Sequence, residues 1–358
     1  MTALAHASSP AHTEAAFQRL QQRLQQRLPD LAFEVRDSVA STNSALIDRA
    51  RQGIATPALL MALAQTQGRG RQGRSWLAEA GASLTFSLSL PLQRADWSGL
   101  SLAVGVALAE ALDATASPQA SPSPDWPNSA QPTPLPQPPR IGVKWPNDLL
   151  LISGTGGLPR KLGGILIESI PLVGQRVAVI GIGLNLRPLR PAMAPTAPLG
   201  NTAPGDRADP VDIAMAGAAS AALSQGFAGL HEIHPDIDAL QALALLAEPL
   251  LDAIEAFERD GFAPQQARYA RRDLLAGMDV VTTLADCPRG RCEGVASDGA
   301  LLLRVDGQLR RVVSGEVSVR VESGPGLAHD MAHDRAPNTA PNTAPNTAPN
   351  TAPSEAAC

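Results

Sequence analysis

The spacing of apolar residues along the chain predicts several helices. Phe17, Leu20, Leu24 and Leu28 form one apolar stripe at helical spacing, and the next residue is a proline that ends it. Residues 45–53 follow a Ser-Thr-Asn segment of helix-capping residues and end at a glycine, which is typical of a short helix. Further helices are expected over residues 99–112, near 211–224, and over 236–260 and 264–274.

Short apolar runs, several with alternating polar positions, predict strands between these helices. We expect strands over residues 33–35, 58–64, 84–90, 141–145, 164–170 and 177–186. From residue 279 to 322 the pattern changes to short strands separated by glycine turns, which indicates a small all-β unit, expected to be a barrel. The layout therefore predicts an α+β fold, with helices against a mixed sheet, followed by a small β domain.

Proline marks the segments that are expected to lie outside the packed domains. The 32 prolines concentrate in residues 115–139, in residues 188–210 and in a tail whose Ala-Pro-Asn-Thr repeat runs from 336 to 351. Such segments bury little apolar surface, so we expect them to be disordered insertions and a disordered tail. The predicted organisation is a leader and helix over 1–30, a main domain over 31–275, a β domain over 278–322 and a tail over 324–358.

Composition and charge exclude several classes of protein. The 358 residues carry a net charge of −5 at pH 7, so the chain as a whole is not a nucleic-acid-binding polycation. Its three cysteines form no disulfide framework or zinc site and suit a reducing cytoplasm. No signal peptide or membrane span is visible in the sequence. We therefore expect a cytoplasmic protein.

The segment GRGRQGRSW, residues 68–76, matches the G-x-G-x-x-G pattern of dinucleotide-binding turns. A strand precedes it, but no helix begins at Gly73 and no acidic residue follows at the distance that a ribose requires. Its three arginines, Arg69, Arg71 and Arg74, combine charge with backbone N–H groups that can approach an anion closely. We interpret the segment as an anion-binding loop over a phosphate; a solvated basic turn and an RNA-binding patch are the alternatives.

Three further segments change this interpretation: KWPND at 144–148, KLGGILIE at 161–168 and GIGLNL at 181–186. Together with Ser-Thr-Asn at 41–43 and the Arg-Gly segment, in this order, they closely resemble the biotin protein ligases, also called biotin–[acetyl-CoA-carboxylase] ligases. The resemblance covers roughly residues 30–322. It implies a catalytic domain with the fold of class II aminoacyl-tRNA synthetases over 31–275 and an SH3-like β domain over 278–322.

The resemblance implies a reaction in two steps. Biotin and ATP give biotinyl-5′-AMP and pyrophosphate, and biotin then passes to one lysine of a biotin carboxyl carrier domain of acetyl-CoA carboxylase or a related carboxylase. The biotin carboxylate is already ionised, since such acids titrate near ~4–5. The obstacle is therefore repulsion between anions, and Arg69, Arg71, Lys144 and Mg²⁺ on the ATP phosphates are suited to reduce it.

The site residues follow from matching the family's motifs to this chain. Lys144 and Arg71 are the expected catalytic residues. The expected biotin-binding residues are Ser41, Thr42, Asn43, Gln65, Arg69, Gly70, Arg71, Lys144, Gly163 and Gly164. The expected ATP- and adenylate-binding residues are Arg69, Arg71, Arg74, Trp76, Asn147, Asn185 and Arg320. No residue is assigned to a metal, because Mg²⁺ is expected mainly through the ATP phosphates.

Some of these residues also have simpler explanations. Ser41, Thr42 and Asn43 could form a plain helix cap, and Gln65 could be an exposed loop amide. A β-bulge is the alternative explanation for the two glycines at 163 and 164. Glu168 is expected to be structural.

Alternatives also stay open for the whole protein. Some family members carry an N-terminal DNA-reading unit, but helix 14–28 alone cannot form one, so we expect no operator binding. The expected partners are biotin, ATP and the carrier domain, without nucleic acid or membrane, and the chain is expected to be a monomer or homodimer. A lipoate-type ligase of the same fold and a non-catalytic biotin or nucleotide binder are the competing functions.

Overall fold

A computed structural model describes residues 10–76, 78, 80–114, 140–152, 159–188, 226–285, 287–313, 319–321 and 356–357. The chain divides into two compact units, the first formed by residues 1–274 with 297–299 and the second by 275–296 with 300–358. The Pro-rich stretch 115–139, most of 188–210 and most of the 324–358 tail lie outside the described residues, as does the predicted helix near 211–224.

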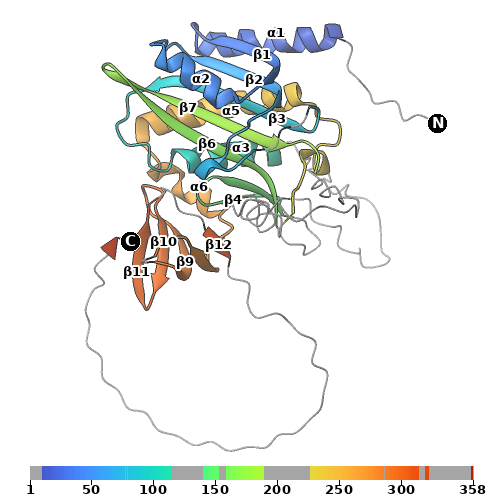
Figure 1. The fold of residues 1–358 in the computed structure, drawn as a ribbon. Helices are drawn as coiled ribbons and strands as arrows, with labels where there is room; N and C mark the ends of the chain where they lie inside the picture. The colour runs from blue at the N-terminus through green and yellow to red at the C-terminus, as the bar shows by residue number, and fades with distance from the viewer. Residues whose placement is uncertain are drawn as a thin grey trace, which may run out of the picture. The chain divides into compact units, whose positions relative to one another are not determined.

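The first unit is built on a seven-stranded mixed sheet of strand order β1-β2-β3-β7-β6-β5-β4. Only the β1–β2 pair is parallel, and the other neighbours are antiparallel (Figure 1). The strands are β1 (Ala32–Val39), β2 (Ala58–Gln65), β3 (Ser83–Leu92), β4 (Arg140–Lys144), β5 (Asp148–Ile152), β6 (Arg160–Leu172) and β7 (Gln175–Asn185).

Helices cover the two faces of this sheet differently. They are α1 (Pro10–Arg27), α2 (Thr42–Arg51), α3 (Leu100–Ala114), α5 (Ala239–Asp260) and α6 (Gln266–Ala270). The helix α3 packs against β4 and β6, where Gly105 lies close to Val143 and Ile165, and α5 packs against α3 and β3. The opposite face receives α2, whose Leu46 and Ile47 pack into a buried apolar cluster with β2 and β7.

The strand β3 explains why the two faces differ. Its residues alternate between Leu or Phe on one face and Ser or Thr on the other, and all of the alternating residues are buried. The apolar side chains face the α3 and α5 layer and supply core area. The other face, which carries Ser83, Thr85, Ser87 and Ser89, is called here the polar face of the sheet.

The second unit is a single sheet of strand order β12-β8-β9-β10-β11-β13. All of its pairs are antiparallel except β11–β13. The strands are β8 (Asp279–Thr282), β9 (Arg289–Val295), β10 (Leu301–Val305), β11 (Gln308–Val312), β12 (Val319–Val321) and β13 (Ala356–Ala357). Cys287 and Cys292 are buried in this unit, and Cys292 lies opposite Leu303.

The predicted α+β fold is confirmed, with three differences in detail. The helix expected over 264–274 is much shorter, because a 3₁₀ turn at Ala263–Gln265 leads into α6, which ends at Ala270. The helix expected over 45–53 begins at Thr42, with only Ser41 as its N-cap. The strand β5 was not predicted, since its sequence DLLLI lacks the alternation of a half-buried strand. No helix in the described ranges has the length and apolar character needed to cross a membrane.

Candidate active site

The strand register brings residues from distant parts of the sequence into one row across the sheet. Lys144 lies opposite Asp148, which lies opposite Gly164, and Gly164 lies opposite Gly183, whose other neighbour is Thr85. Residues directly opposite one another share a face of the sheet, so all five belong to the polar face. Gly164 and Gly183 have no side chains, so the sheet surface between the Lys144–Asp148 pair and β3 is low. These two positions are called here the glycine floor.

A buried polar cluster lies on the same face, at the N-terminus of α2. The Gln65 side-chain oxygen accepts hydrogen bonds from the Thr42 backbone N–H at 2.7 Å and from its hydroxyl at 3.2 Å. The Ser87 hydroxyl lies 2.7 Å from Thr42 Oγ1 and 2.5 Å from Asn43 Oδ1. Ser41 caps the helix by accepting from the Ser44 N–H at 3.4 Å. The structure therefore brings the predicted Ser41, Thr42, Asn43 and Gln65 together.

Asn43 is held in place from three sides. Besides its contact with Ser87, its Nδ2 donates to Glu168 Oε2 at 2.9 Å and to the Leu166 carbonyl at 3.4 Å. A Cβ atom on Gly181 would lie only 2.2 Å from Asn43 Oδ1, so a glycine is needed at that position. Asn43 is 4% exposed, and its orientation is fixed before any ligand arrives.

Residues 68–76, called here the Arg-Gly loop, form a narrow hairpin. The Gly70 N–H donates to the Arg74 carbonyl at 2.7 Å, and the Trp76 N–H donates to the Gly68 carbonyl at 2.8 Å. A Cβ on Gly68 would lie 2.3 Å from the Trp76 oxygen, so this close approach requires glycine. At the tip Gln72 and Gly73 have φ angles of 57° and 69°. The sequence thus folds the loop back on itself through one distorted 3₁₀ turn, Arg71–Gly73, and not into the α-helix that a dinucleotide-binding turn would begin.

The Arg-Gly loop lies on the glycine floor. A Cβ on Gly183 would meet the Trp76 ring at 2.4 Å, so the indole packs directly on the β7 backbone. Arg69 forms an ion pair with Glu168 at 3.3 Å, and Arg71 Nη1 lies 3.5 Å from Asn147 Oδ1. The loop therefore joins the α2 end of the site to the β4–β5 turn.

The three arginines of the loop have different surroundings. Burial lowers the pKa of the Arg71 guanidinium below its ordinary value, while the nearby Asp148 carboxylate opposes the shift. The group stays charged at neutral pH because an arginine titrates far above it. Arg69 is half exposed. Arg74 is exposed, and its side chain contacts Gln72 at 3.1 Å. Of the three, Arg71 is the partly desolvated cation nearest the β4–β5 turn.

The turn from β4 to β5 carries Lys144, Asn147 and Asp148. The Asn147 N–H donates to the Lys144 carbonyl at 3.2 Å, and its side-chain amide donates to the Ile165 carbonyl at 2.8 Å. KWPND is therefore the turn of a hairpin, and not only the end of a strand. A half-buried Lys144 and a half-buried Asp148 flank it.

Lys161 belongs to the site although the sequence interpretation did not include it. Its Nζ lies 2.7 Å from Asp148 Oδ1 and 5.9 Å from the centre of the Trp76 ring. Its carbonyl accepts from the side chain of Asn185 at 3.2 Å. The signal was present in the sequence, because Lys161 opens the KLGGILIE segment, two residues before Gly163.

Glu168, which is expected to be structural, lies beside the candidate site residues. It accepts from Asn43 and pairs with Arg69, so it links the α2 cluster to the Arg-Gly loop. Period-2 spacing from Gly164 indicates this, since residues 164, 166 and 168 share one face of β6. A carboxylate four residues after a candidate ligand-binding glycine is therefore on the ligand side of the strand.

The two glycines of β6 have different environments. The register with β5 shifts between Leu149 and Leu150, so a β-bulge does occur beside Gly163. A Cβ on Gly163 would lie 2.4 Å from Leu184 Cδ2 and 2.6 Å from the Gly183 carbonyl, which makes this glycine a packing requirement. A Cβ on Gly164 would meet nothing closer than 3.5 Å. Of the two, only Gly164 has room for a methyl group, which would be in ordinary contact with Asp148, Asn147 and Lys161.

Two buried polar atoms near the floor have no hydrogen-bond partner among the described residues. They are Asn185 Oδ1 and Trp76 Nε1, an acceptor and a donor. Asn185 is completely buried at the end of β7. An unpaired buried polar group is costly, so these atoms are suited to a ligand or water with complementary groups. Arg320 lies in β12 of the second unit, opposite Val281, and its assignment stays a prediction.

The arrangement is suited to an anionic ligand that lies along the sheet. Lys144, Lys161 and Arg71 surround one end of the glycine floor, and neutral amides and hydroxyls surround the other. Within the described ranges no group of three His, Cys, Asp or Glu side chains could hold a metal ion. A ligand with an uncharged polar head and a charged tail would fit this distribution.

Two family models match the sequence. Residues 35–185 match the Biotin/lipoate A/B protein ligase family, and residues 286–320 match the Biotin protein ligase C terminal domain. The biotin–[acetyl-CoA-carboxylase] ligase of Paracoccus denitrificans is 30% identical over 268 residues, which cover 74% of this chain and 90% of that protein. The bifunctional ligase/repressor BirA of Escherichia coli K12 is 29% identical over 286 residues, covering 79% and 72%.

The fold agrees with these matches. The solved structure of biotin protein ligase from Aquifex aeolicus in complex with biotin and ATP aligns with a TM-score of 0.55 at 22% identity, covering 81% of this chain and 99% of that one. The sequence matches span both the main sheet and the small C-terminal sheet. The chain therefore belongs to the biotin protein ligase family, the biotin–[acetyl-CoA-carboxylase] ligases.

Proposed function

We propose that this ligase activates biotin with ATP to biotinyl-5′-AMP, releasing pyrophosphate, and transfers biotin to a lysine of a biotin carboxyl carrier domain. The observation that carries the proposal is the Arg-Gly loop seated on the glycine floor between three cations and a neutral polar cluster. The names of the relatives support it, since the Paracoccus relative is a biotin–[acetyl-CoA-carboxylase] ligase and the Aquifex relative was solved with biotin and ATP.

The neutral cluster is assigned to the biotin head. A ureido ring presents two N–H donors and one carbonyl acceptor, and hydroxyl and amide groups can serve both. Ser41, Thr42, Asn43 and Gln65 supply these groups, and Ser87 holds two of them in place. Because the cluster is buried and already hydrogen-bonded, it binds the head without reorganising. Gly164 gives the tail of biotin room to lie along β6.

The cationic end is assigned to the reacting groups. Two like unit charges ~4 Å apart repel by about 1 kcal/mol in water and by about 4 kcal/mol at an effective dielectric constant of 20. Lys144 and Arg71 would offset this repulsion between the biotin carboxylate and the α-phosphate. Lys161 joins them in this role, because its ammonium lies at the same end of the floor. No general base is required, since the nucleophile is already a carboxylate.

The nucleotide is assigned to the region between the Arg-Gly loop and the end of β7. Asn147 and Asn185 offer amides, and Trp76 offers a ring and an indole N–H. Arg69, Arg74 and Arg320 are proposed as further phosphate or adenylate contacts. Mg²⁺ is expected to arrive with the ATP phosphates and to neutralise part of their charge. Asp148 fits such an ion, since carboxylate oxygens are what Mg²⁺ prefers.

The Arg-Gly loop is proposed to protect the intermediate. Biotinyl-5′-AMP is a mixed anhydride that water would hydrolyse, so a covering segment that excludes water preserves it until the acceptor lysine arrives. The contacts of the loop with Glu168 and with the β7 backbone at Gly183 are consistent with such a cover. The same proposal has three further parts. The acceptor is a biotin carboxyl carrier domain, the chain is a monomer or a homodimer, and it acts in the cytoplasm.

The decisive experiment is a pyrophosphate-release assay on the purified chain with ATP and Mg²⁺. Biotin-dependent release, followed by transfer of labelled biotin to an added carrier domain, is the expected result. Lipoate is the matched control, because the wider family includes lipoate ligases. Pyrophosphate release with lipoate but not with biotin would identify the chain as a lipoate ligase. Biotin binding without release would show a non-catalytic binder.

A further inference from the structure

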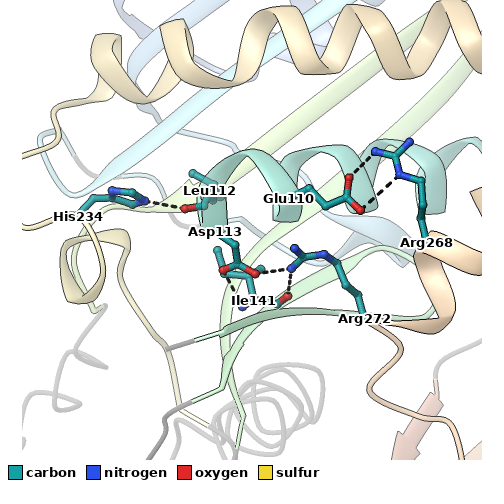
Figure 2. Close-up of polar contacts among 7 residues, drawn as sticks. All are labelled: Glu110, Leu112, Asp113, Ile141, His234, Arg268 and Arg272. Atoms are coloured by element: carbon teal, nitrogen blue, oxygen red, sulfur yellow. Dashed lines mark hydrogen bonds and ion pairs between the residues drawn. The ribbon is translucent and has the colours of Figure 1, made fainter. Parts of the chain in front are cut away.

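A polar junction lies where three segments meet at the edge of the sheet. It joins Asp113, in the last turn of α3, to Ile141 at the start of β4 and to Arg272 beyond α6 (Figure 2). The Ile141 N–H donates to Asp113 Oδ1 at 3.2 Å. Arg272 Nη1 donates to the Ile141 carbonyl at 2.7 Å and also forms an ion pair with the other Asp113 oxygen. Both backbone groups of Ile141 are thus held by one salt bridge.

The same segment also covers the outer edge of β4. The strand β4 is the last in the sheet order, so one of its edges pairs with no other strand in the described part of the chain. The Val143 N–H donates to the Arg272 carbonyl at 2.8 Å, and the Leu274 N–H donates to the Val143 carbonyl at 3.2 Å. A Cβ on Gly142 would lie 2.5 Å from Leu274 Cδ2, so glycine permits this close approach. Arg272 therefore fixes β4 with its side chain and its backbone.

The junction is more buried than the ion pair next to it. The side chains of Arg272 and Asp113 are 12% and 20% exposed. One helical turn earlier, Arg268 pairs with Glu110, and these side chains are 38% and 31% exposed. Figure 2 shows that only the Arg272 pair reaches β4, whereas the Arg268 pair joins α6 to α3 alone. The chain thus contains a natural control for the junction.

The connection that leads into β4 explains why such a junction is needed. Residues 115–139 join α3 to β4, which is far longer than the usual connection between such elements. The contact between Asp113 and the Ile141 N–H ties the two ends of this connection together directly, because Asp113 lies in the last turn of α3 and Ile141 at the start of β4. The end of α3 is also held from another side, since His234 Nε2 donates to the Leu112 carbonyl at 2.8 Å. The inner edge of β4 pairs with β5, and Asp113 and Arg272 hold its outer edge at Ile141.

We propose that Arg272 is a positioning residue for the adenylation step, holding β4 through Asp113 and Ile141 so that Lys144 faces the glycine floor. Lys144 follows Val143, the residue whose N–H and carbonyl both bond to the Arg272–Leu274 segment. Arg272 itself lies in the junction and would affect Lys144 only through the position of β4. The proposal rests on the role assigned to Lys144 under the proposed function.

A double-mutant cycle tests it. Arg272→Gln is made in the parent chain and in Lys144→Ala, and biotin-dependent pyrophosphate release is measured in single turnovers together with KM for biotin. A misplacement of about 1 Å can cost on the order of a hundredfold in rate, so a loss of that size is expected in the parent. In the Lys144→Ala background, Arg272→Gln should lower the adenylation rate by no more than about twofold further. Lys144 is then already absent, so a residue that acts only through Lys144 has little left to affect.

Two controls separate positioning from general stability. Arg268→Gln breaks the neighbouring pair, which joins α6 to α3 without bonding to β4, and should leave the adenylation rate within about twofold of the parent. KM for biotin should change less than the rate in Arg272→Gln, because the biotin head is assigned to the polar cluster on α2, β2 and β3, whereas only the carboxylate end is assigned to Lys144. Arg272→Lys, which keeps the charge but not the forked donors, should recover only part of the rate. If Arg272→Gln does not fold, Asp113→Asn replaces it and should show the same pattern.

The outcomes are distinct. A full additional loss on top of Lys144→Ala, or an equal loss in Arg268→Gln, would overturn the positioning role. A parent chain without biotin-dependent release would instead overturn the proposed function, and a fully active Lys144→Ala would overturn the assignment of Lys144 on which the inference rests. A loss in Arg272→Gln that appears only when Lys144 is present establishes the inference.

Discussion

The two adjacent glycines of β6 provide the sharpest test of the site, because the structure assigns them different roles. Gly164→Ala adds a methyl group whose nearest neighbours, Asp148, Asn147 and Lys161, lie at 3.5–3.8 Å, which is ordinary contact distance. The substitution should leave folding intact or stabilise it by about 0.4–1 kcal/mol, because alanine has less freedom in the unfolded chain. Its methyl group would then stand on the polar face where the biotin tail is proposed to lie.

Gly163→Ala should behave in the opposite way. Its added methyl would lie 2.4 Å from Leu184 Cδ2 and 2.6 Å from the backbone oxygen of Gly183, and a backbone atom cannot move aside cheaply. Overpacking of this kind typically costs about 1–3 kcal/mol. For a unit of this size each kcal/mol lowers Tm by roughly 2–4 °C. We therefore expect a fall of about 2–12 °C in Gly163→Ala and none in Gly164→Ala.

The two variants are compared by thermal unfolding and by KM for biotin in the pyrophosphate assay. If the Gly164 methyl costs the ligand about 1–3 kcal/mol, KM rises by a factor of about 5 to 150. Gly163→Ala should retain a parental KM at temperatures where it is folded. A stable Gly164→Ala with parental KM and rate would refute the placement of the biotin tail over Gly164, and an equal loss of stability in both variants would refute the difference in packing.

Three further predictions concern the cations and the tail. Lys144→Ala should slow adenylate formation about 10²–10³-fold in single turnovers, because a contact made to developing charge is typically worth about 2.7–4 kcal/mol; an unchanged rate would contradict the assignment. Arg71→Gly should release biotinyl-5′-AMP faster into solution, measured as acceptor-independent biotinylation of a bystander protein, and tight retention would argue against the role of Arg71. Deleting residues 325–358 should leave kcat and KM for biotin unchanged, and a large loss would show that the tail takes part.

Much of the fold was predictable because local and global preferences agree. The polar and apolar alternation of β3 indicates a strand with two different faces, and the cap residue Ser41 marks the start of α2. The strand β5 was missed because a central strand that is buried on both faces reads as a continuous apolar run, which periodicity alone cannot assign. The helix beyond α5 was overestimated, since segment 272–274 instead extends along β4.

The candidate site was predictable where local motifs mark its residues, and not where strand register brings them together. Motif resemblance found Ser41, Thr42, Asn43 and Gln65, which the structure does bring together. It did not include Lys161, because a lysine at a strand start looks like a surface residue until the register places it beside Asp148. Long-range pairings of this kind depend on strand register, which no local pattern fixes by itself.

The contacts of the Arg-Gly loop indicate what holds it on the sheet. The Arg69–Glu168 pair is half exposed on the arginine side, and exposed ion pairs contribute only about 0–1 kcal/mol and weaken with salt. Trp76 packs its ring directly on the backbone at Gly183, and the burial of an aromatic side chain contributes more than such a pair. The indole therefore does more than the Arg69 pair to hold the loop closed. Because breaking the Arg69 pair costs so little, the phosphate contact proposed for Arg69 would be compatible with a loop that stays on the sheet through Trp76.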